Sequence, residues 1–133
     1  MVTKRTFGYG SYRFELDSAV NGINPSVVLG LFTWSDDPAY THREIDVECG
    51  RWANPGDVNN AQYVVQPWDW PSHLVRYAVP ADLTNSTHSF TWETNCVSYQ
   101  ALAVGKRVVL FASQMSSAKS LPGKFLPVFW RPV

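Results

Sequence analysis

Residues 43–49 read Arg43-Glu44-Ile45-Asp46-Val47-Glu48-Cys49, a stretch in which three acidic residues alternate with three apolar ones. Side chains of a β-strand alternate between its two faces, so the pattern predicts a strand with an acidic face and an apolar face. Three like charges on one face repel one another and raise the pKa of at least one carboxyl. We therefore interpret the apolar face as core and the acidic face as a site for chemistry, in preference to a face that carries solvating charge.

The rest of the chain also favours strands. It contains six tryptophans, six tyrosines and seven phenylalanines, and its nine prolines and eight glycines separate short runs rich in aromatic and β-branched residues. Such a composition is typical of an all-β sandwich, and no stretch has a convincing helical pattern. Besides the acidic stretch, we predict strands over residues 11–17, 26–34, 61–66, 74–79, 87–93 and 97–104.

Length and charge limit the classes of protein to which the chain can belong. A chain of 133 residues is enough for one domain, which we place over residues 1–133. Eleven basic and eleven acidic residues give no net charge and no Lys/Arg cluster, so a nucleic-acid partner is not expected. The longest mostly apolar run, residues 27–32, is too short to span a membrane, and residues 1–5 lead into no apolar signal region.

The two cysteines, Cys49 and Cys96, both fall at apolar-facing positions of predicted strands. This placement is compatible with buried thiols or with a disulfide bridge. We favour two core thiols and leave the bridge open.

Three stretches, in the expected order, resemble glycoside hydrolase family 16, the family of β-glucanases, laminarinases, agarases and carrageenases. Glu44-Ile45-Asp46-Val47-Glu48 looks like its E-x-D-x-E signature, Phe7 to Glu15 (FGYGSYRFE) is similar to its YGxYE strand, and Thr87 to Trp92 (THSFTW) resembles its FHxYxxxW strand with a shorter His-to-Trp interval. The likeness covers about residues 7–105, whereas residues 106–133 match poorly. It implies an antiparallel β-sandwich of the concanavalin-like jelly-roll type, curved around the acids and incomplete at one or both ends, because the family's domain is longer.

The resemblance further implies a retaining endo-glycosidase that cleaves β-linked polysaccharide. By position in the signature, Glu44 is the expected nucleophile and Glu48 the expected general acid and base. Asp46 lies between them and is expected to help keep Glu48 protonated. The Cα atoms of residues four apart on a strand are about 13 Å apart, and inward-leaning glutamates could bring their carboxyls to roughly 5–6 Å, nearer the retaining than the inverting spacing. The alternative is a non-catalytic carbohydrate-binding protein or an inactive, truncated fragment of such a domain.

Aromatic rings and amides near the acids are the candidate sugar-binding groups, since glycan clefts combine apolar platforms with a few polar side chains. Family resemblance suggests a stacking role for Trp34, while alternation places His42, Gln62 and Gln66 beside the acids. The predicted substrate-binding residues are Trp34, His42, Gln62, Gln66 and Trp68. We favour a core position for Phe32, leave Trp52 and Trp70 open, and interpret His88, Phe90 and Trp92 as structural.

For partners, the resemblance implies a polysaccharide or oligosaccharide substrate and an extracellular or periplasmic location. We predict no cofactor and no metal ligands. A structural calcium ion would follow from the family alone, and a calcium site built from the three acids is less favoured because such sites usually recruit backbone oxygens and loop residues. The glycan, its linkage and the oligomeric state are left open.

Overall fold

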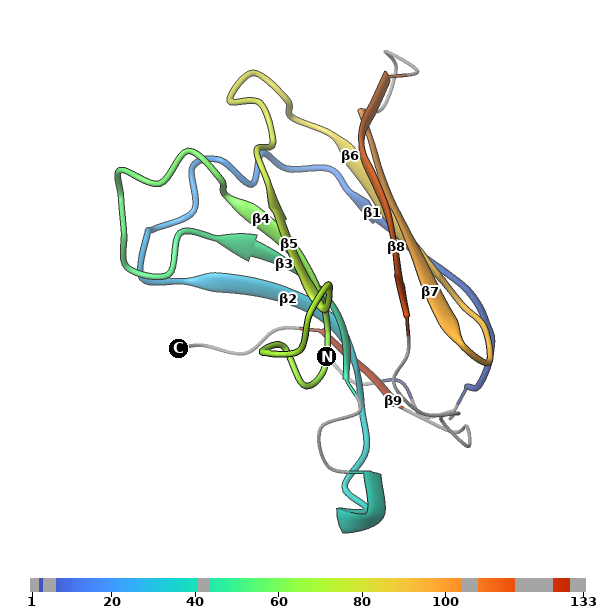
Figure 1. The fold of residues 1–133 in the computed structure, drawn as a ribbon. Coiled ribbons are helices and arrows are strands. Elements are labelled where there is room, and N and C mark those ends of the chain that lie inside the picture. The colour runs from blue at the N-terminus through green and yellow to red at the C-terminus, as the bar shows by residue number, and fades with distance from the viewer. Residues whose placement is uncertain (1–2, 4–6, 41–43, 104–107, 117–125, 130–133) are drawn as a thin grey trace.

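The computed structural model describes residues 3, 7–40, 44–103, 108–116 and 126–129, with the backbone alone for residues 40, 108–116 and 126–129. Its strands form two antiparallel sheets that pack face to face (Figure 1). The four-stranded sheet has the order β1 (Gly10–Leu16), β6 (Ser86–Trp92), β7 (Cys96–Ala103) and β8 (Val108–Ser116). The five-stranded sheet has the order β5 (Leu74–Tyr77), β4 (Ala61–Val65), β3 (Ile45–Gly50), β2 (Val28–Trp34) and β9 (Leu126–Phe129).

All seven predicted strands are present, with ends that differ by at most two residues. The only helical element within the described residues is a 3-10 turn, η1 (Pro38–Tyr40), in the loop that precedes the acidic stretch. No helix in the described part of the chain has the length and apolarity needed to cross a bilayer. The prediction of an all-β antiparallel sandwich is therefore confirmed.

Two strands, β8 and β9, were not predicted from the sequence. β8 pairs with β7 through a register shift between Ala101 and Leu102, and β9 occupies the edge of its sheet beside β2. Pro127 lies opposite Thr33 in that edge strand. Proline lacks the amide hydrogen that a central strand needs and is tolerated at an edge, which fits the position of β9 at the edge of its sheet.

The core lies between the two sheets. Ile45, Val47 and Cys49 of β3 are all fully buried there, as the alternating pattern predicts. Tyr63 of β4 stacks on Tyr99 of β7 with ring centroids 4.4 Å apart, which joins the two sheets through their aromatic rings. Burial of side chains of this size stabilises the fold by about 1.5–3 kcal/mol each. The acidic strand is thus held from behind by the core of the domain.

The structural interpretation of His88, Phe90 and Trp92 is confirmed, since all three are buried in the core. The two ring nitrogens of His88 lie 3.2 Å from the Tyr77 hydroxyl and 3.0 Å from the Ser86 hydroxyl. Burial lowers the pKa of His88 to about 4, so the imidazole is neutral at neutral pH.

The prediction of two core thiols is wrong for one of them. Cys49 is fully buried, but Cys96 is only half-buried, and the two cysteines do not form a disulfide. Cys96 opens β7, in which Val97 and Tyr99 face the core, so alternation turns the Cys96 side chain to the outer face. There its Sγ lies 3.6 Å from a carboxylate oxygen of Glu93.

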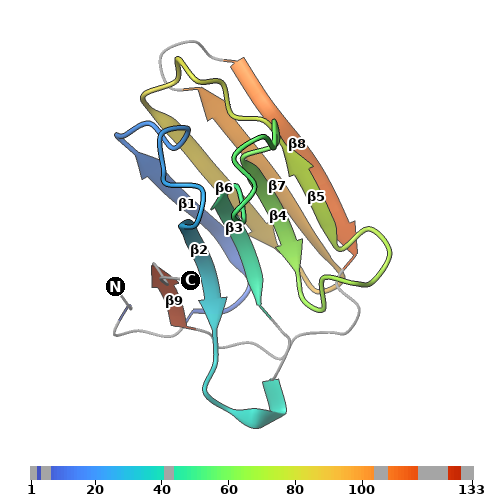
Figure 2. The same ribbon diagram turned by 90° about the vertical axis from the view of Figure 1, so that its left-hand side faces the viewer.

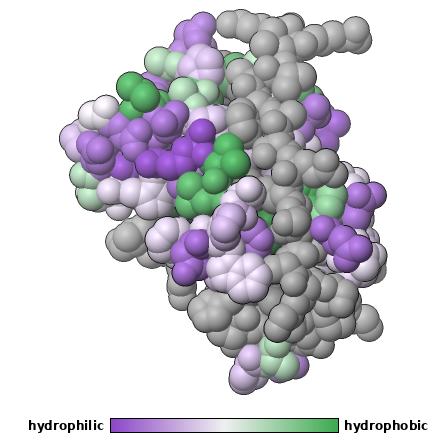
Figure 3. Space-filling view, viewed as in Figure 1, coloured by the Kyte–Doolittle hydropathy of each residue, from purple (hydrophilic) through white to green (hydrophobic). Residues whose placement is uncertain are grey.

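A polar network fastens the loops at one end of the five-stranded sheet. The Arg51 guanidinium donates to the backbone and side-chain oxygens of Asn21, and the Asn60 amide donates to the same Asn21 side chain. Asn60 also exchanges hydrogen bonds with the backbone of Val79. These loops carry a gathering of hydrophilic residues, seen on the left of the space-filling view (Figure 3). Their backbone is therefore anchored although their surface is solvated.

Candidate active site

Because Ile45, Val47 and Cys49 face the core, alternation places the three acids on the outer face of the five-stranded sheet. This face is turned toward the viewer in Figure 2. The register places Asp46 between Phe32 of β2 and Val64 of β4, and Glu48 between Gly30 and Gln62. Glu44 immediately precedes β3. Its backbone oxygen accepts a hydrogen bond from the backbone N–H of Gln66. We call this surface the acid face. The residues that alternation assigns to it are Gly30, Phe32, Trp34, Glu44, Asp46, Glu48, Gln62, Val64, Gln66, Leu74 and Arg76.

Asp46 is the most enclosed of the acids, with only 4% of the residue exposed. Burial raises its pKa well above the usual value, and the neighbouring charges of Glu44 and Glu48 raise it further. A hydrogen bond from the Gln66 side chain opposes these effects but does not cancel them. Asp46 therefore favours its protonated form.

Glu48 lies beside an amide donor. Gln62 Nε2 donates to Glu48 Oε2 over 2.6 Å, across the β3–β4 pair. Burial raises the pKa of Glu48, while this hydrogen bond favours the charged form and limits the rise. A carboxyl with a raised pKa is suited to donate a proton near neutral pH.

This arrangement corrects one expectation. We expected the charge of Asp46 to keep Glu48 protonated, but burial is the main cause of the raised pKa of Glu48. The repulsion among the carboxyls falls instead on Asp46, the central member, which has an acidic residue two positions away on either side. A protonated Asp46 places no additional negative charge between the two glutamates.

Replacement of Asp46 by Asn should stabilise the fold at neutral pH. In the unfolded chain this carboxyl ionises near its usual value of 3.8, whereas the folded chain resists ionisation. The free energy of unfolding should therefore fall as pH rises from about 4 through the raised folded pKa, and Asn removes that loss. We expect the melting temperature of Asp46→Asn at pH 7 to exceed that of the unmodified chain by roughly 3–6 °C, with little difference at pH 4.

Thermal melts followed by circular dichroism at both pH values would measure this effect. Asp17→Asn, a change at an exposed carboxylate directly after β1, serves as the control and should leave the melting temperature unchanged at either pH. Equal or lower stability of Asp46→Asn at pH 7 would contradict the prediction.

The predicted binding residues divide into three groups. Trp34, Gln62 and Gln66 lie on the acid face, and the two amides hydrogen-bond to Glu48 and Asp46 respectively. Trp68, with 61% of the residue exposed, lies in the β4–β5 loop, where its backbone N–H donates to Gln66 Oε1. The structure thus places Trp68 next to the acid face rather than among the acids. His42 lies outside the described residues.

Sequence reasoning missed or misplaced other residues of this surface. Phe32, which we favoured as core, lies opposite Asp46 on the acid face, and its ring centroid is 6.5 Å from that of Trp34. Leu74 and Arg76 extend the face across β5, where Arg76 is opposite Gln62. The alternation Leu74-Val75-Arg76-Tyr77 could have revealed this, but only if the neighbour of β5 in the sheet had been known.

No group of three or more His, Cys, Asp or Glu side chains within the described ranges is arranged to hold a metal ion. The acids of β3 project from a single strand face, whereas calcium sites usually enclose the ion with oxygens from several directions. Two of the three carboxyls, those of Asp46 and Glu48, are hydrogen-bonded by the side-chain amides of Gln66 and Gln62.

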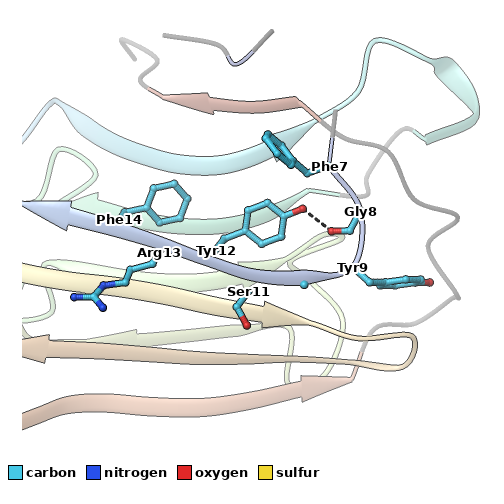
Figure 4. Close-up of a pocket in the computed structure, with 8 residues that line it drawn as sticks. Phe7, Gly8, Tyr9, Ser11, Tyr12, Arg13 and Phe14 are labelled. Carbon is cyan, nitrogen blue, oxygen red and sulfur yellow. Dashed lines mark hydrogen bonds between the residues drawn. The ribbon is translucent and has the colours of Figure 1, made fainter. Parts of the chain in front are cut away.

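A separate hollow of about 360 Å³ lies beside the start of β1, in the other sheet (Figure 4). It is lined by residues 7–14, and Phe7, Tyr12 and Phe14 lie on one side of the strand. The Tyr12 hydroxyl donates to the backbone oxygen of Gly8. Because β1 is the edge strand of its sheet, this hollow is a feature of the sheet edge and not of the acid face.

Comparison with known proteins shows the fold. A scan against protein-family models finds no match, and a search of the curated proteins finds none either. Among solved structures, the chain is similar to the Bacillus licheniformis β-glucanase, with TM-score 0.62 and 21% identity over 99% of this chain and 57% of that one. A prokaryotic β-1,3-1,4-glucanase (lichenase) derived from a mouse hindgut metagenome matches with TM-score 0.63 and 21% identity, over 99% and 57% of the two chains.

A third solved structure, the κ-carrageenase of Zobellia galactanivorans, matches with TM-score 0.60 and 16% identity over 96% of this chain and 53% of that one. These three proteins are named as enzymes that act on polysaccharides, and this chain shares their jelly-roll fold. It spans a little over half of the length of each.

Proposed function

We propose that the chain carries the catalytic strand of a retaining endo-glycosidase of the glycoside hydrolase family 16 type, which hydrolyses β-linked polysaccharide. The observation that supports this proposal best is the acid face, where three carboxyls on one strand differ in burial and hydrogen bonding. A retaining glycosidase needs one carboxylate that attacks and one carboxyl that donates a proton. The E-x-D-x-E signature and the shared fold point to the same chemistry.

In the proposed reaction, an ionised Glu44 oxygen attacks the anomeric carbon while the glycosidic C–O bond breaks. Glu48 gives its proton to the departing oxygen, so the leaving chain departs as a neutral alcohol. In the second step, the Glu48 carboxylate takes a proton from water, and the water oxygen displaces Glu44 from the anomeric carbon. The two inversions give net retention.

Asp46 and the amides would position this pair. The Gln62 hydrogen bond fixes the Glu48 carboxyl, and a protonated Asp46 lets Glu44 ionise beside a neutral neighbour. Trp34, Trp68 and His42 are proposed to contact the sugar rings, with Gln62 and Gln66 at the same surface. A location outside the cytoplasm and a single domain over residues 1–133 belong to the same proposal.

A second function, carbohydrate binding without hydrolysis, is favoured by one observation. The chain spans a little over half the length of the solved enzymes whose fold it shares. The acid face would then bind a glycan without completing the reaction.

Product analysis decides between the two functions. After a cooperative thermal melt has shown that the chain is folded, a reducing-sugar assay would test laminarin, mixed-linkage glucan, agarose, carrageenan and xyloglucan. Proton NMR of the first-formed sugar should then show the β-anomer. An α-anomer as first product would overturn the retaining mechanism, and binding without release of reducing ends would favour the second function.

A further inference from the structure

Trp52 lies at the end of the acid face that is nearer to Glu48, in the loop between β3 and β4. Arg76 links Trp52 to the acid face. In the sheet, Arg76 is opposite Gln62, and Gln62 is opposite Glu48. These three residues form a row across three strands on one face of the sheet. The Arg76 guanidinium carbon is 4.4 Å from the centre of the Trp52 ring, so the ring lies next to this row.

The backbone at Trp52 is held in an uncommon conformation. Trp52 and Ala53 have φ angles of 47° and 62°, in the left-handed region that residues other than glycine rarely adopt. The Ala53 amide donates to the backbone oxygen of Pro25, and the Asn54 amide donates to that of Arg51. Such conformations persist only where the surroundings enforce them, and they cluster at functional sites.

The cation beside Trp52 is already committed to other partners. Arg76 Nη1 lies 2.7 Å from a carboxylate oxygen of Asp57, and its Nη2 donates to the backbone oxygen of Asn59 over 3.0 Å. These two bonds hold the guanidinium in place over the indole ring, where the cation and the ring attract each other. Trp52 remains half-buried, so this residue is accessible to a ligand in solution.

We infer that Trp52, braced by Arg76, is a stacking platform for a neutral glycosyl unit on the leaving-group side of the acid face. A fixed aromatic ring offers apolar contact to the C–H face of a sugar at little entropic cost. Trp52 is assigned to the leaving-group side because it lies near Glu48, and this assignment rests on the proposed function.

The bound sugar is expected to be neutral because the acid face offers no uncompensated cation to an anionic sugar. Arg76 is the only cation assigned to this face in the described residues, and Asp57 compensates its charge.

A binding measurement tests the platform without any need for turnover. The Glu44→Gln chain would be titrated with laminaritetraose, a neutral glucan oligosaccharide, while the indole N–H signals of the tryptophans are followed by NMR. The Trp52 signal, identified by its absence from a Trp52→Phe chain, should shift on binding. A sulfated carrageenan tetrasaccharide should bind at least about tenfold more weakly. A Trp52 signal that stays in place, or equal binding of the sulfated sugar, would overturn the inference.

Kinetics test the side on which Trp52 acts. Trp52→Ala should lower kcat/KM for the tetrasaccharide about tenfold, the effect of truncating an aromatic anchor, and leave kcat/KM for an activated aryl glycoside unchanged. Trp52→Phe should recover most of the loss. Tyr9→Ala removes an exposed aromatic ring next to the other sheet and should leave kcat/KM unchanged for both substrates. An equal loss on both substrates would refute the leaving-group assignment.

The two proposals fail in different ways. If the unmodified chain hydrolyses nothing, the proposed function and the leaving-group assignment fail together. The platform itself still stands or falls on the NMR titration, which requires only binding.

Discussion

Replacement of Glu44 by Gln should abolish hydrolysis of polysaccharide and of activated aryl glycosides alike. The amide has nearly the shape of the carboxylate but cannot form the covalent glycosyl intermediate, so the first step is lost whatever the leaving group. We expect a fall in kcat of about 10⁴-fold or more, with substrate affinity largely retained. Reducing-sugar release and chromophore release from an aryl glycoside measure the two activities.

Two further variants make this result specific. Glu15→Gln, at an exposed carboxylate paired with Arg13 on the opposite sheet, should keep full activity. In Glu44→Ala, added azide should restore cleavage of the aryl glycoside and give a glycosyl azide of inverted configuration, since a small anion fits the space of the lost nucleophile. Full activity of Glu44→Gln would refute the proposed mechanism.

Replacement of Glu48 by Gln should lower hydrolysis of polysaccharide far more than cleavage of activated aryl glycosides, whereas Glu44→Gln affects both equally. A sugar leaving group needs a proton, and loss of a general acid typically costs about 10²- to 10⁴-fold. An aryl leaving group that is stable as an anion needs little protonation, so the first step on such a glycoside should be nearly normal. A burst of released chromophore followed by slow turnover is expected, because the second step still lacks its base.

The pH profile gives a second measure of the role of Glu48. The rate of polysaccharide hydrolysis should decline at pH values above the raised pKa of Glu48. This alkaline limb of the pH–rate profile should be absent in Glu48→Gln. Gln62→Met removes a hydrogen bond that favours the carboxylate, so it should move the same limb to higher pH. Equal loss of both substrates in Glu48→Gln, without a burst, would contradict the assignment of Glu48 as the acid.

The acidic stretch was sufficient to predict its own strand. Ile45 and Val47 are buried in the core and Asp46 lies on the opposite face, because strict alternation over six residues leaves a strand only one way to place its apolar side chains. The same reasoning placed Gln62 on the face that carries the acids, and the structure brings it within hydrogen-bond distance of Glu48.

Features that depend on neighbours in space were not accessible in this way. The burial of Asp46 on an outer face depends on what surrounds it there, and Phe32 was misplaced because β2 is apolar on both faces. The position of Arg76 next to Trp52 requires the order of strands β3, β4 and β5 as well as the course of the loop. The sequence pattern specifies a residue's face, whereas sheet order decides which residues share that face.

Cys49 lies directly behind the acid face, on the same strand as Glu48, and burial raises the pKa of its thiol to about 12. Because only the thiolate attacks an alkylating reagent, Cys49 should stay unlabelled for as long as β3 remains in place, whereas the half-buried Cys96 on the outer face of its sheet reacts first. With Cys96 replaced by Ser, the rate of Cys49 alkylation measures how often the acidic strand opens. An oligosaccharide bound on the other side of β3 should lower that rate by the factor with which it stabilises the folded chain.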